Sequence, residues 1–138
     1  MRGANAATWR PRATLERALR IAEKHYGPVH VEVARAVEMS GFQSYLSGEY
    51  DEALGQYRRA LEIREAVFGP GHAASGWNLY DQACLLALAG DPAAALATLR
   101  RALESGWASD RIFEDDDFDS LRGNPDFDAI LAEVRERL

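Results

Sequence analysis

The stretch ALRIAEKHYGPVH at residues 18–30 returns as ALEIREAVFGPGH at residues 60–72, 42 residues further along the chain. A second stretch, LSGEYDEAL at residues 46–54, matches LAGDPAAAL at residues 88–96 at the same offset. Several matched positions at one fixed offset are hard to obtain by chance. Repeats of this length are typical of supersecondary units that bury their apolar faces against one another. The sequence therefore predicts a repeat protein.

Each repeat unit has the pattern of two helices joined by a tight turn. Gly48 and Gly90 stand where the chain must reverse between the two helices, a position that favours positive φ. Gly41 and Ala83 occupy equivalent positions in the first helices, where a small side chain lets two helix backbones approach closely. The second helix of one unit carries apolar residues at helical spacing, namely Ala53, Leu54, Tyr57, Ala60, Leu61 and Phe68. We therefore expect an all-α array of antiparallel helix hairpins.

The pattern G-x-Y-x-x-A-L-x-x-Y-x-x-A-L at residues 48–61 resembles a tetratricopeptide repeat. The 42-residue period and the motif E-x-x-x-G-P-x-H, at residues 23–30 and 65–72, resemble the kinesin-light-chain-like subclass of that family. The resemblance covers about residues 13–138 and implies an α-α superhelix that ends in a C-terminal capping helix. It also implies a protein-binding module, since the fold hosts many binding roles.

On this reading, residues 1–12 form a flexible basic arm and residues 13–138 a single domain. The domain comprises a half repeat (13–29), two repeats (30–70 and 71–106), and an acidic linker with a capping helix (107–138). The first copy lacks its first helix, so helix 14–26 is expected to expose an apolar face, although solenoid ends normally carry a polar cap. Either a second copy covers that face or the chain is a piece of a longer array. The residues expected to make a homodimer there are Leu15, Leu19 and Ala22.

The resemblance implies that the first helices of the hairpins line a concave, peptide-binding groove. The residues expected in it are Arg35, Glu38, Met39, Phe42, Tyr45, Trp77, Tyr80, Asp81 and Cys84. Aromatic side chains dominate binding hot spots, but the same residues at helical spacing also suit a packed seam between helices. The family often has asparagine where Met39 and Asp81 stand. An ionised aspartate only accepts hydrogen bonds, so a basic or apolar segment is expected rather than an acidic one.

No catalytic, cofactor or metal motif stands out. His30 and His72 take the same place in two repeats, which favours a shared structural role at the start of a helix over metal ligation. Cys84 has no base near it in the sequence and is expected to be a small buried side chain. The acidic run at residues 114–119 alternates as an EF-hand loop does, but Ser120 replaces the required glycine. We expect no enzyme, no cofactor and no metal site, and instead a short helix that starts in the acidic run.

The composition of the 138 residues fits a soluble, globular binding module. The formal net charge is −6, and residues 104–138 carry eleven acidic against four basic side chains, so nucleic acid is not an expected partner. Neither a membrane span nor a signal peptide is evident, and we expect a cytoplasmic protein of the kind found in bacteria. The predicted function is to bind a protein or peptide in the groove. The alternatives are self-association as a homodimer and a regulatory part of a larger signalling enzyme.

Overall fold

The computed structural model describes residues 12–138, which form seven α-helices, two short 3-10 helices and no β-strand. The predicted all-α helical repeat is thereby confirmed. By its contacts the chain divides into two compact units, residues 12–70 and residues 71–138 of the described part. Each helix in these residues falls short of the length and apolar character that a membrane span needs.

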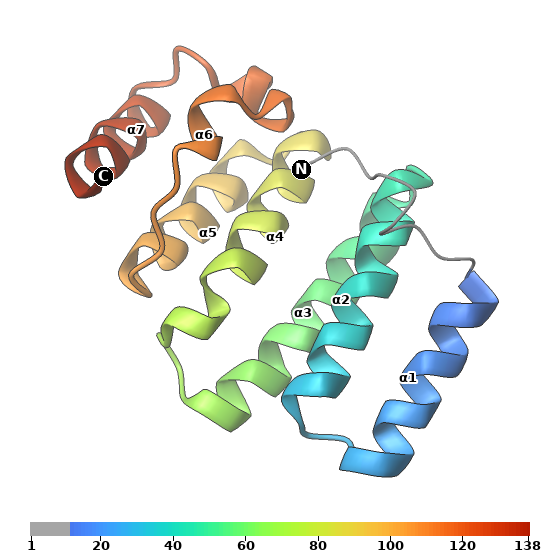
Figure 1. Ribbon diagram of the computed structural model, residues 1–138. Helices are drawn as coiled ribbons and strands as arrows, with labels where there is room; N and C mark the ends of the chain where they lie inside the picture. The colour runs from blue at the N-terminus through green and yellow to red at the C-terminus, as the bar shows by residue number, and fades with distance from the viewer. Residues whose placement is uncertain (1–11) are drawn as a thin grey trace. The chain divides into compact units, whose positions relative to one another are not determined.

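The first unit consists of α1 (Arg12–Tyr26), α2 (Val31–Leu46) and α3 (Tyr50–Phe68), which lie side by side in Figure 1. The turn between α2 and α3 contains Gly48 at a φ of 77°, the left-handed conformation expected at the reversal. Leu19 and Ala22 of α1 pack against an apolar core that α2 and α3 share. The core residues are Val33, Ala34, Val37, Ala60 and Ile63.

Close packing between α2 and α3 depends on Gly41. A Cβ atom at this position would lie 2.9 Å from Cε2 of Tyr57 and 3.4 Å from the carbonyl oxygen of Ala53. Tyr57 is 3% exposed, so its ring has little room to move away. The small residue predicted here from the repeat pattern is therefore required by the packing.

The second unit begins with η1 (Ala73–Ser75), α4 (Gly76–Leu88) and α5 (Pro92–Glu104), and α4 packs against α5. It continues with α6 (Arg111–Glu114), η2 (Asp116–Leu121) and α7 (Pro125–Arg137). In this unit η2 packs on α4, and α7 packs on α5 (Figure 1). The acidic run starts η2 as expected, because the side chain of Asp115 accepts a hydrogen bond from the amide of Asp117.

Both ends of the predicted domain are formed by helices, α1 and α7. α1 begins at Arg12, so the last residue assigned to the basic arm is helical, and the salt bridges of its guanidinium with Glu49 and Glu52 hold that end of α1. The rest of the predicted arm, residues 1–11, lies outside the described residues. At the other end, α7 starts at Pro125 behind the Asn124 cap, as the sequence predicts.

Candidate functional site

The residues that α2 contributes to the predicted groove lie on its surface. Arg35 is exposed and pairs with Glu32 at 3.4 Å. Met39 is 45% exposed, which is high for a large apolar side chain. Phe42 and Tyr45 are half-buried, and their rings stack with centroids 6.0 Å apart. α2 thus presents an apolar patch of Met39, Phe42 and Tyr45.

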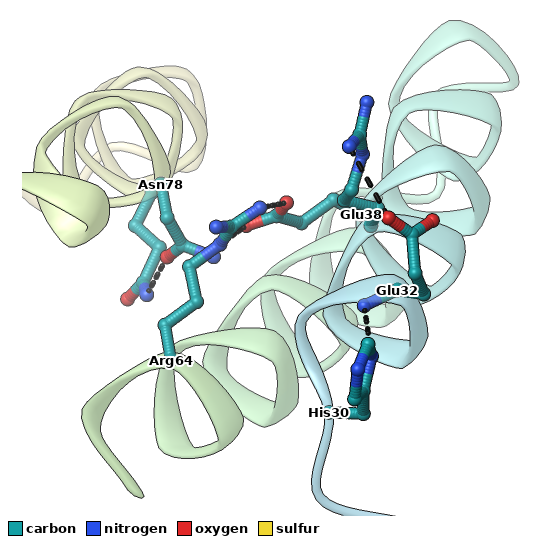
Figure 2. Close-up of polar contacts among 7 residues, drawn as sticks. His30, Glu32, Glu38, Arg64 and Asn78 are labelled. Carbon is teal, nitrogen blue, oxygen red and sulfur yellow. Dashed lines mark hydrogen bonds and ion pairs between the residues drawn. The ribbon is translucent and has the colours of Figure 1, made fainter. Parts of the chain in front are cut away.

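Glu38 is engaged in a bidentate pair within the first unit. The Arg64 guanidinium donates from Nε to Oε2 of Glu38 at 3.0 Å and from Nη2 to Oε1 at 2.6 Å (Figure 2). Both side chains are largely buried, with exposed fractions of 15% and 18%. These hydrogen bonds raise the pKa of the Arg64 guanidinium above its ordinary value. The pair ties α3 to α2, so the charge of Glu38 is balanced within the unit.

Most of the residues that α4 was predicted to contribute to the groove are buried. Trp77 is 47% exposed, but Tyr80, Asp81 and Cys84 are buried. The prediction that these three side chains line an open groove is therefore wrong. For Tyr80 and Cys84 the reason is that the chain's own segment 107–121 covers that side of α4.

The contacts of Tyr80 show how this segment covers α4. Its ring stacks on Trp107 with centroids 4.8 Å apart and meets the edge of Phe118 at 5.5 Å. Its hydroxyl donates to Oδ2 of Asp115 at 2.6 Å. Burial, together with the nearby Cys84 and Asp115, raises the pKa of the Tyr80 hydroxyl above its ordinary value. Tyr80 is thus a core residue of the second unit.

Cys84, Asp115 and Asp117 come together beneath this segment. Their potential ligand atoms lie within 4.8 Å of one another, and the Cys84 sulfur is 3.8 Å from Oδ2 of Asp115. Burial raises the pKa of the Cys84 thiol, which disfavours the thiolate that metal binding and nucleophilic attack require. Asp115 already accepts hydrogen bonds from Tyr80 and from the Asp117 amide. We therefore interpret the cluster as part of the packing of the second unit.

Trp77 stands at the edge of an aromatic cluster that sequence reasoning missed. The ring of Trp107 meets it edge-on with centroids 5.7 Å apart, and the guanidinium of Arg111 lies over it at 5.8 Å. Among residues 12–138, Trp107 Nε1 and Arg111 Nη1 are buried and have no hydrogen-bond partner. Both residues follow the last helix of the repeat pattern, so no repeat position pointed to them.

The surface predicted for self-association is also corrected. Leu15 is 4% exposed, and Leu19 and Ala22 pack on the core of the first unit. The prediction that these three residues form an exposed face is wrong, because α2 packs against that side of α1. The exposed apolar residues of α1 include Ala18 and Ile21 instead.

The histidines at matched repeat positions do have a common structural role. Nδ1 of His30 accepts from the amide of Glu32 at 3.0 Å (Figure 2), and Nδ1 of His72 accepts from the amide of Ala74 at 2.9 Å. Each side chain therefore caps the start of a helix, α2 for His30 and η1 for His72. The predicted structural role is confirmed.

Comparison with known families agrees with the observed hairpins. The family model described as Tetratricopeptide repeat matches residues 40–105, which run from within α2 to the start of the segment after α5. Among curated proteins none matches the chain. The kinesin-light-chain-like subclass stays a prediction. The family match and the helix hairpins together identify residues 40–105 as tetratricopeptide repeats.

Proposed function

We propose that the chain binds a segment of another protein at Trp77 in the second unit, and that the apolar patch of Met39, Phe42 and Tyr45 is a separate contact surface of the first unit. Tetratricopeptide repeats generally mediate protein–protein interaction. The observation that carries the proposal is the 47% exposure of Trp77, whose ring lies beside the ring of Trp107 and the guanidinium of Arg111.

The Trp77 site has the composition of a binding hot spot. Tryptophan and arginine are enriched at the few interface positions whose truncation costs most of the binding energy. A partner that places an apolar side chain on Trp77 covers the exposed ring, beside which Trp107 and Arg111 lie.

The charge of the second unit favours a partner segment with basic residues. Residues 104–138 carry eleven acidic and four basic side chains, and Asp110 and Glu114 on either side of Arg111 are exposed. Opposite charge raises the rate at which a partner finds its site and weakens as salt screens it. The proposed ligand is thus an apolar segment flanked by lysine or arginine.

A peptide library displayed on phage and selected on the immobilised chain tests the proposal. We expect selected peptides to combine an apolar anchor with basic flanks. Trp77→Ala should weaken their binding by about 30-fold, the loss that corresponds to about 2 kcal/mol at a hot spot. Met39→Ala should weaken it less.

The matched control is Val67→Ala on α3, because Val67 is 43% exposed and is not a residue of either proposed contact surface. This control should bind as the unchanged chain does. Circular dichroism checks that every variant is folded. Failure to select any peptide, or equal binding by folded Trp77→Ala and Val67→Ala, would overturn the proposal.

A further inference from the structure

Ala18 and Ile21 form an exposed apolar stripe on α1, whereas the residues at the matching positions of the next repeat are buried. Ala18 and Ile21 correspond, 42 residues on, to Ala60 and Ile63 of α3. Ile21 is 57% exposed whereas Ile63 is 7% exposed, and Ala18 is exposed whereas Ala60 is fully buried. The difference arises because Ala60 and Ile63 pack with residues of α2, and no described helix takes that place on α1.

The way in which α2 covers Ala60 and Ile63 indicates which kind of helix fits the stripe on α1. α2 presents Val33, Ala34 and Val37 to Ala60 and Ile63, that is, small and β-branched side chains that permit a close approach. A helix with small residues on its outward side therefore suits Ala18 and Ile21.

The charged residues around the stripe indicate the charge of the helix that would cover it. Arg17 and Lys24 lie beside Ala18 and Ile21 on the helix surface, and Arg20 lies next to them. All three basic side chains are exposed. The acidic Glu23 of α1, by contrast, pairs with Arg59 at 3.5 Å. The stripe thus has a basic border, which favours an acidic helix.

α7 carries an outward face of that kind. Its inward face, with Phe127, Ile130 and Val134, is buried in the second unit. Its opposite face contains Ala129 and Ala132, which are exposed and one helical turn apart. The exposed acidic residues beside these alanines are Asp126, Asp128 and Glu136. Arg135 also lies beside Ala132, and its guanidinium lies over the ring of Phe113 at 5.0 Å, so acidic side chains outnumber basic ones here.

We propose that the chain self-associates head to tail, with the outward face of α7 in one copy covering Ala18 and Ile21 of α1 in the next. Alanines at Ala129 and Ala132 allow the two helices to approach closely over Ala18. The acidic residues of α7 pair with the basic border of α1. Such a contact joins two different surfaces, so it leaves one unpaired surface at each end and extends into a chain or closes into a ring.

The contact is independent of the peptide-binding proposal, since it uses neither Trp77 nor the patch on α2. It also differs from the homodimer predicted from sequence, in which the same surface of α1 would meet itself. An interface with charged borders loses strength as salt rises, so association should be strongest at low ionic strength.

Sedimentation equilibrium of the full chain, from micromolar to millimolar concentration, tests the proposal with two blocking variants. Ala18→Arg blocks α1, and Ala132→Arg blocks α7. Each substitution places a long charged side chain at an exposed alanine, so each variant should fold. We expect the average mass of the unchanged chain to rise with concentration. Either variant alone should self-associate at least about tenfold more weakly.

Mixing the two variants gives the decisive result. Each retains the surface that the other lacks, so an equimolar mixture should form a one-to-one dimer and nothing larger. Ala66→Arg, an exposed alanine of α3, is the matched control and should associate as the unchanged chain does. A monomeric mass for the unchanged chain at all concentrations, a dimer of Ala132→Arg alone, or no dimer in the mixture would overturn the proposal.

Discussion

Replacing Gly41 with alanine tests the contact that holds α2 against α3. The added Cβ would lie 2.9 Å from Cε2 and 3.0 Å from Cδ2 of Tyr57. Carbon atoms in favourable contact are about 3.5–4.0 Å apart. Because Tyr57 is 3% exposed, the ring can yield only by shifting the helices or leaving its preferred rotamer.

The expected change in the free energy of unfolding follows from two opposing effects. Overpacking of a filled core costs about 1–3 kcal/mol. Alanine in place of glycine inside a helix returns about 0.5–1 kcal/mol. Gly41→Ala should therefore destabilise the protein by up to about 2.5 kcal/mol. Gly41→Leu adds three further carbon atoms and should destabilise it more.

Gly55 provides the matched control, because it lies inside α3 and a Cβ built on it meets nothing within 4 Å. Gly55→Ala should stabilise the protein by about 0.5–1 kcal/mol. Urea denaturation followed by circular dichroism gives the free energy of unfolding of each variant. Adding Tyr57→Leu to Gly41→Ala should recover part of the loss, as a double-mutant cycle measures. Equal stabilisation by Gly41→Ala and Gly55→Ala would refute the packing argument.

Four further predictions concern one helix cap and the buried groups of Tyr80 and Cys84. His30→Ala should cost about 0.5–2 kcal/mol of unfolding free energy because the amide of Glu32 loses its acceptor; His30→Asn should recover most of it, and equal urea midpoints for the two variants would count against the cap. Tyr80→Phe should cost about 1–3 kcal/mol because buried Asp115 loses a donor at 2.6 Å; an unchanged urea midpoint would contradict that. Burial raises the pKa of the Cys84 thiol above its ordinary value of 9.0, so at pH 8 iodoacetamide should modify it only in denaturant, as mass spectrometry detects. Because the pKa of the thiol is raised in the folded chain, only the unfolded thiol ionises as the pH passes 9.0. The free energy of unfolding should therefore fall above that pH, and it should fall less in Cys84→Ala.

Much of the fold is encoded in short stretches of the sequence. The helical spacing of apolar residues and the reversal at Gly48 predict the α2–α3 hairpin, because both depend on residues close together in the chain. The 42-residue offset adds that the pattern recurs. The requirement for a small residue at Gly41 also follows from the repeat pattern, and the structure shows its partner to be Tyr57. The helix caps at His30 and Asn124 are local in the same way.

The candidate sites depend on contacts that no local pattern records. Periodicity places Tyr80 on one face of α4 but does not reveal that Asp115, 35 residues later, covers that face. For the same reason the sequence identified α1 as amphipathic and chose the wrong residues as exposed, since which side meets α2 is decided by packing. The sequence by itself determined the helices, their pairing into hairpins and the family. Only the tertiary structure decided which side chains stay exposed, because exposure depends on segments distant in the chain that fold over them.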